Sequence, residues 1–95
     1  LHTSMRIVFS PQASQDLIRL RAFIAAHHPQ AAANAAARIV SVIDTVSQLP
    51  LIGRPVRERT DIRELPFSFG ASGYLLRYQL TSEDIRILRI WHMQE

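Results

Sequence analysis

The sequence predicts one α+β domain with the element order β-α-α-β-β-β, in which an antiparallel helical hairpin packs on one face of a small, mostly antiparallel sheet. In the first half of the chain, apolar residues recur every three or four positions, which is typical of amphipathic helices. In residues 74–80 and 85–92 they alternate along the chain, which is typical of half-buried strands. A chain of 95 residues is long enough for one domain with a modest core.

The first strand and the first helix are predicted within residues 5–27. Residues 5–9 (MRIVF) form the strand. Ser10 and Pro11 then supply an N-cap and a proline at the first helical position, so the helix is expected to run to about His27. The stripe of this helix that is expected to be buried consists of Ala13, Leu17, Leu20 and Ile24.

A second helix is predicted from Pro29 to about Gln48. His28 ends the first helix, because a residue that precedes a proline disfavours helical geometry. The expected buried stripe of the second helix consists of Ala32, Ala36, Ile39, Ile43 and Val46. Two helices joined by such a tight turn form an antiparallel hairpin.

The rest of the chain is predicted as a loop followed by three strands. Residues 50–61 (PLIGRPVRERTD) contain two prolines and a glycine and are expected to form the loop. Pro66 indicates an edge position in the strand that follows, and residues 70–73 form the turn into the next strand. Residues 81–83 are a polar break of turn length, which predicts that the last two strands form an antiparallel hairpin.

Composition excludes several classes of protein. The chain has no cysteine, which excludes a disulfide framework, a thiolate metal site and a cysteine nucleophile, and which suits a reducing cytoplasm. No apolar run approaches the length of about 18 residues that would predict a membrane span, and no signal peptide is recognisable. His27 and His28 diverge by roughly 100° on a helix, so we expect neither a metal nor a cofactor. Residues 1–4 are interpreted as a cloning remnant, and residues 5–95 as the single domain.

All eleven basic residues are arginines, and the formal net charge is +3. A GC-rich genome explains this preference, and so does recognition of phosphate or carboxylate groups by planar guanidiniums. Arg19 and Arg21 fall outside the buried stripe of the first helix and are expected to face solvent. The arginines expected to bind a partner lie in the loop (Arg54, Arg57, Arg59 and Arg63) and on the last strands (Arg77, Arg86 and Arg89).

The order and spacing of several segments resemble the RelE/ParE superfamily of toxins from bacterial type II toxin–antitoxin, or plasmid stabilisation, modules. The segments are FSPQASQDL (9–17), LPLIGRPV (49–56), IREL (62–65), YLLRYQL (74–80) and IRILRIWH (85–92). The resemblance implies a cognate antitoxin, often acidic, which would fit the basic surface, and exposed apolar grooves that favour a homodimer. It also implies one of two targets: ParE-like members inhibit DNA gyrase, whereas RelE-like members cut mRNA on the ribosome.

Cleavage of RNA requires a base, a cation that stabilises the phosphorane, and an acid. The sequence offers either Glu58 or Glu64 as the base and His92 as the acid. The cation could come from Arg57, Arg59, Arg77 or Arg89. Simpler interpretations are that both glutamates are solvated and that His92 is a hydrogen-bonded structural group. For a metal-independent nuclease, the catalytic candidates are therefore Glu58, Arg77 and His92.

The chain departs from the pattern of the RelE-like nucleases that it resembles. It has Gly73 where they tend to carry an arginine, Met93 after His92 where they often carry a nearby tyrosine, and no lysine. This incomplete set favours a ParE-like gyrase inhibitor that is not an enzyme. A ribosome-dependent endoribonuclease and a degenerate, non-toxic antitoxin-binding module are the two alternatives.

Overall fold

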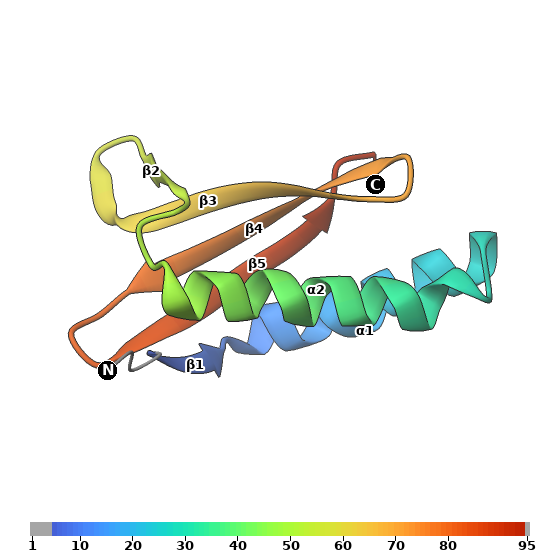
Figure 1. The fold of residues 1–95 in the computed structure, drawn as a ribbon, viewed down its shortest axis with the longest axis horizontal. Coiled ribbons are helices and arrows are strands. Elements are labelled where there is room, and N and C mark those ends of the chain that lie inside the picture. Colours follow the sequence, from blue (N-terminus) through green and yellow to red (C-terminus); the bar gives the residue numbers. More distant parts are fainter. Residues whose placement is uncertain (1–4, 95) are drawn as a thin grey trace.

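The computed structural model describes residues 5–94, so the interpretation of residues 1–4 lies outside it. One five-stranded sheet has the order β1-β5-β4-β3-β2, and two antiparallel helices lie along one of its faces (Figure 1). The strand β1 pairs in parallel with β5, and all other pairs are antiparallel. The elements are β1 (Arg6–Phe9), α1 (Pro11–His27), α2 (Ala31–Gln48), β2 (Arg54–Val56), β3 (Arg59–Phe69), β4 (Ser72–Leu80) and β5 (Asp84–His92). The predicted α+β architecture is confirmed.

The two helices follow the local signals closely. The Ser10 hydroxyl accepts a hydrogen bond from the Ala13 amide at 3.0 Å, as the N-cap predicts. The buried stripe of α1 is as expected, with Leu17 only partly buried. In α2 the prediction was wrong by one position, because Ala35 is buried whereas Ala36 is exposed. A run of alanines carries too little periodicity to determine which face is buried.

The loop predicted for residues 50–61 contains an additional strand, β2, which was not expected. It pairs with the beginning of β3 through a tight turn in which Glu58 has a φ of 69°. Because β2 reaches only as far as Glu64 along its partner, β3 has no strand neighbour on that side at Pro66. The edge position predicted for Pro66 is therefore confirmed.

The strand β5 contains a bulge at Leu88 that the alternating pattern did not predict. Arg89 lies opposite Arg77, whereas Ile87 lies opposite Tyr78, so Leu88 has no partner on β4. A bulge of one residue reverses the side to which all later side chains point. Beyond it, Ile90 turns toward the core, where strict alternation would place the side chain of Arg89.

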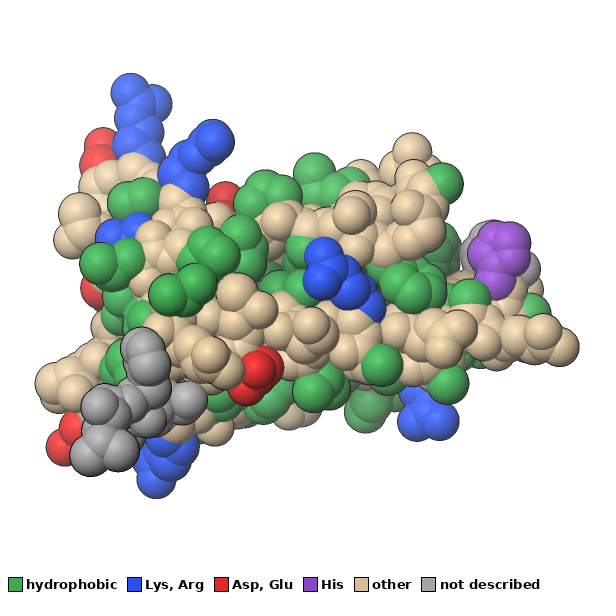
Figure 2. Space-filling model, in the orientation of Figure 1, with side chains coloured by type: hydrophobic (Ala, Val, Ile, Leu, Met, Phe, Trp, Pro, Cys, Tyr) green, Lys and Arg blue, Asp and Glu red, His purple; other side chains and the backbone are tan. Residues whose placement is uncertain are grey.

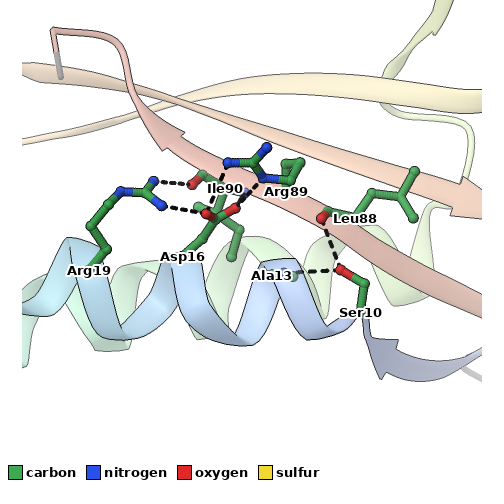
Figure 3. Close-up of polar contacts among 7 residues, drawn as sticks. All are labelled: Ser10, Ala13, Asp16, Arg19, Leu88, Arg89 and Ile90. Atoms are coloured by element: carbon green, nitrogen blue, oxygen red, sulfur yellow. Dashed lines mark hydrogen bonds and ion pairs between the residues drawn. The ribbon is translucent and has the colours of Figure 1, made fainter.

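Beyond the end of β1, side chains of the helix α1 bond to the edge of β5. The pairing of β1 stops at Ile87, and beyond it the backbone of β5 bonds to side chains near the start of α1 (Figure 3). The Ser10 hydroxyl donates to the Leu88 carbonyl at 2.9 Å, and the Asp16 carboxylate accepts from the Ile90 amide at 2.8 Å. These bonds satisfy backbone groups that would otherwise be unpaired.

The Asp16 carboxylate is buried, with 2% of its side chain exposed, and it is paired with two arginines. Arg89 donates from Nε at 2.8 Å and from Nη2 at 3.2 Å. Arg19 also donates to Asp16 and reaches the Ile90 carbonyl, so the expectation that Arg19 simply faces solvent was wrong. Burial raises the pKa of Asp16, but the hydrogen bonds from Arg89, Arg19 and the Ile90 amide outweigh it and lower the pKa to about 2.

Replacing Asp16 by asparagine is expected to lower the free energy of unfolding at pH 7 by about 3 kcal/mol, because Arg89 loses its buried partner. The native pKa of about 2 lies below an unfolded value near 3.9. The ionised carboxylate therefore contributes about 2.5 kcal/mol above pH 4, and this contribution disappears as the pH falls toward 2.

Urea titrations of the wild type and Asp16→Asn between pH 2 and 7 would measure this difference. The gap between the two proteins should narrow below about pH 4. Asp44→Asn, which removes an exposed carboxylate from α2, is the control and should change stability by less than about 0.5 kcal/mol. A gap for Asp16→Asn that stays constant down to pH 2 would contradict the ionic role.

Candidate functional site

The face of the sheet away from the helices carries a tryptophan in contact with two arginines. The Cζ atoms of Arg77 and Arg89 each lie 5.0 Å from the centroid of the Trp91 ring. Arg77 and Arg89 are directly opposite each other on β4 and β5. Contact with the aromatic ring offsets part of the repulsion between these like charges.

Both of these arginines are also paired with carboxylates. Arg77 donates from Nε to Glu64 on β3 at 2.8 Å, and Arg89 reaches Asp16 on α1. The predicted exposed arginines of the last strands are therefore only partly exposed at these two positions. Glu64, expected to be a solvated charge, is likewise held in an ion pair. A polyanion that bound here would have to displace Glu64 and Asp16, which weakens this face as a nucleic-acid site.

His92 lies on the opposite face of the sheet from Arg77. Its ring is buried between Phe23 of α1 and Tyr74 of β4, at centroid distances of 5.0 and 4.9 Å. Its Nδ1 accepts a hydrogen bond from the Gln94 amide at 3.0 Å. These contacts support the expectation of a structural, hydrogen-bonded histidine.

Glu58 occupies a third location, the exposed turn between β2 and β3. Glu64, which lies opposite Arg77, is six positions further along the chain, or roughly 20 Å of extended strand. Of the three catalytic candidates, Glu58 therefore lies at a hairpin turn and His92 in the core. Arg77 lies on the face of the sheet away from the helices, which we call the open face. The structure does not bring Glu58, Arg77 and His92 together around one reacting atom.

The connection between α2 and β2 is held from beneath by two side chains of the sheet. The Tyr78 hydroxyl accepts from the Gly53 amide at 2.9 Å and donates to the Pro50 carbonyl at 2.7 Å. Arg63 donates to the carbonyls of Gly53 and Leu51, at 2.6 and 3.2 Å. Burial raises the pKa of Tyr78. Arg63, predicted to bind a partner, thus has bonds that position this connection.

Glycine is required at position 53 by the close approach of the ring beneath it. A Cβ atom there would lie 2.7 Å from the Tyr78 hydroxyl oxygen, which is closer than real contacts allow. We call residues 49–53 the apolar loop, because its three large side chains, Leu49, Leu51 and Ile52, are all exposed. Sequence reasoning identified this segment only as a loop, since exposure depends on what lies beneath it.

Arginines project next to the apolar loop. In Figure 2, apolar side chains cover the connection from α2 to β2, and arginine side chains project from the adjoining β2–β3 hairpin. The side chains of Arg54 and Arg57 are exposed and form no hydrogen bond or ion pair within the described residues 5–94, although the backbone of Arg54 pairs with Glu64 on β3. Arg59, by contrast, pairs with Asp61 at 3.0 Å and lowers the pKa of that carboxyl group. Arg86, on β5, lies 3.7 Å from Asp84.

A separate apolar groove of about 220 Å³ lies along the helical hairpin. Side chains from both helices line it, and most of them are aliphatic. Among the described residues that line it, Arg21 alone is charged, and the set is Phe9, Leu17, Leu20, Arg21, Ile24, Ala32, Ala35, Ala36, Ile39, Val40 and Ile43. The small side chains of the first half of α2 leave this groove open.

Within residues 5–94, none of the helices is both long and apolar enough to cross a membrane. The same part of the chain contains no group of three histidine or carboxylate side chains that could hold a metal ion.

Comparisons with known proteins assign the family. The family model described as the ParE toxin of the type II toxin–antitoxin system matches residues 7–95. Toxin RelE1 of Caulobacter vibrioides is 33% identical over 90% of this chain and 90% of its own length. Toxin RelE3 of the same organism is 36% identical over 94% of this chain and 95% of its own length.

A solved structure of a chromosomal ParDE toxin–antitoxin system from P. aeruginosa has the same fold. It superposes with a TM-score of 0.73 over 94% of this chain and 96% of that chain, at 20% identity. With residues 7–95 matched by the family model, this chain belongs to the ParE toxin family of type II toxin–antitoxin systems, within the RelE/ParE superfamily.

Proposed function

We propose that this toxin acts by binding DNA gyrase in the cytoplasm and inhibiting it, and that it is not an enzyme. The observation that carries the proposal is the separation of Glu58, Arg77 and His92, which occupy a turn, the open face of the sheet and the core. General acid–base catalysis needs its groups within hydrogen-bond reach of one substrate. A binding toxin needs only a surface, which the exposed arginines and apolar side chains provide.

Position 73 supports the same proposal. RelE-like nucleases resembling this chain tend to carry an arginine there. In this chain a Cβ atom at Gly73 would lie 3.3 Å from Cγ of Met93, so a larger side chain would require Met93 to shift. That shift is small and Met93 is exposed, so the support from position 73 is the absence of the arginine itself.

The second candidate function is ribosome-dependent cleavage of mRNA. The names of the two Caulobacter relatives, Toxin RelE1 and Toxin RelE3, favour it. If the toxin cleaves mRNA, its catalytic groups must be residues other than Glu58, Arg77 and His92, because these three side chains do not lie near one another.

A cognate antitoxin is the partner that membership of the family implies. We place it in the groove of the helical hairpin, where one apolar face of a helix would cover the aliphatic side chains of α1 and α2. A carboxylate on the antitoxin would pair with Arg21. In the absence of the antitoxin, the same groove would favour a homodimer.

Two assays with the purified protein separate the candidate functions. Low-micromolar toxin is expected to block the supercoiling of relaxed plasmid by DNA gyrase. It is expected to leave mRNA intact on programmed ribosomes, as read by primer extension. Cleavage of the mRNA without inhibition of gyrase would reverse the assignment, and inactivity in both assays together with normal growth on expression would indicate a degenerate module.

Glu58→Asn tests the catalytic role of that carboxylate without disturbing the turn, because asparagine tolerates the positive φ. Growth arrest on expression should be unchanged, and the free energy of unfolding should stay the same or rise by about 0.5 kcal/mol. Glu83→Gln in the β4–β5 turn is the control for loss of an exposed carboxylate. A loss of activity on the order of 100-fold for Glu58→Asn alone would indicate a general base.

A further inference from the structure

The apolar loop combines exposed aliphatic side chains with a fixed backbone. Leu51 is 68% exposed, and Leu49 and Ile52 are also exposed. These exposed side chains contribute no apolar burial to the free protein. The loop is nevertheless held by hydrogen bonds from Tyr78 and Arg63. A loop fixed in this way loses little conformational entropy when a partner covers it, which is the property of a docking surface.

The charges around the loop define its partner. Arg54 follows the loop directly and Arg57 lies in the next turn, and neither side chain forms an ion pair in the described part of the chain. Glu64, which lies opposite Arg54, is paired with Arg77. Arg59 pairs with Asp61, so it contributes less net charge. An apolar centre with a cationic rim complements a surface that has apolar side chains between carboxylates.

We infer that the apolar loop, with Arg54 and Arg57, is the surface that binds the toxin's target. The part of the target that it binds is an acidic protein segment carrying apolar side chains. The inference rests on the proposed function, in which the toxin acts by binding a protein. A nucleic acid fits the loop less well, because bases stack on aromatic side chains and residues 49–57 include none.

The target surface is distinct from the groove in the helical hairpin. The shallow depression in the apolar loop is lined by residues 48–52, and the groove is lined by residues of β1, α1 and α2 up to Ile43. No residue is shared between them. A variant in the loop therefore changes the target surface and leaves the groove intact.

Leu51→Ser tests the apolar centre, and Ile18→Ser is its matched control. Ile18, on α1, is 72% exposed, compared with 68% for Leu51, and it does not line the groove. Leu51→Ser is expected to raise the concentration of toxin that half-inhibits gyrase supercoiling at least tenfold and to abolish growth arrest. Ile18→Ser should stay within twofold of the wild type. Thermal unfolding of both variants shows whether they remain folded.

Arg57→Glu tests the cationic rim, with Arg38→Glu on the exposed side of α2 as a control that makes the same change in net charge. Arg57→Glu is expected to weaken inhibition at least tenfold, and the remaining inhibition should depend less on salt than that of the wild type. Arg38→Glu should stay within threefold. Equal losses for the two variants would show that only net charge matters, which would overturn the surface assigned here.

The readouts distinguish failure of this inference from failure of the proposed function. If the wild type arrests growth without inhibiting gyrase, the proposed target is wrong. In that case growth arrest on expression is the activity by which the variants are compared. If Leu51→Ser and Arg57→Glu lose growth arrest while their control variants keep it, the apolar loop remains supported as the target-binding surface. Equal activity of Leu51→Ser and Ile18→Ser overturns the inference. So does a change of oligomeric state by light scattering that is confined to Leu51→Ser, because a second copy would then be the partner.

Tyr78→Phe tests whether the rigidity of the loop contributes. The variant keeps the buried ring but removes the hydroxyl that bonds Pro50 and Gly53. Hydrogen exchange of the Gly53 amide is expected to accelerate at least tenfold more than that of Leu76 on the same strand as Tyr78, and inhibition should weaken several-fold. Faster exchange at Gly53 with unchanged inhibition would overturn the role of Tyr78 as a positioning residue.

Discussion

The fold depends on how the edge of β5 is closed beyond the point where β1 ends. A central strand needs a partner on both sides, and β1 covers only the first four residues of β5. The Asp16 carboxylate replaces the missing strand by accepting from the Ile90 amide, and it neutralises Arg89 at the same time. Together with Ser10 and Arg19, which donate to the Leu88 and Ile90 carbonyls, this side chain fixes the position of α1 on the sheet. Because α2 packs on α1, the position of the helical hairpin follows from the same contact.

The bulge at Leu88 determines which chemistry the sheet can present. In a strand without a bulge, His92 would share a face with Arg86 and would lie on the same side of the sheet as Arg77. The inserted residue reverses this, so that His92 enters the core and Trp91 comes to the open face. An acid and a cation that the sequence places on neighbouring strands are therefore separated by the sheet itself. This single irregularity is the main structural reason to favour binding over cleavage.

The sequence predicted the features that depend on local chemistry. The N-cap at Ser10, the stripe of α1 and the edge position of Pro66 each follow from residues close by in the chain, and the structure has all three. The features that it could not predict depend on distant partners. Arg89 and Asp16 are 73 positions apart, and no periodicity links them. The sequence therefore predicted which arginines could bind a partner. Only the structure shows which of them are already paired with a carboxylate of this chain.

The preference for arginine has a structural explanation at several positions. Arg63 donates to two backbone carbonyls, and Arg77 and Arg89 each donate two hydrogen bonds to a carboxylate. Arg77 and Arg89 each donate from two nitrogens, Nε and Nη2, which a lysine could not reproduce, whereas both bonds of Arg63 come from Nη1. At these three positions the guanidinium serves the fold, so the count of eleven arginines overstates the cations available to a partner. Among the described residues, the side chains of Arg54 and Arg57 have no such bonds, and they lie next to a loop with three exposed aliphatic side chains. That combination makes this end of the molecule the best surface for a protein target.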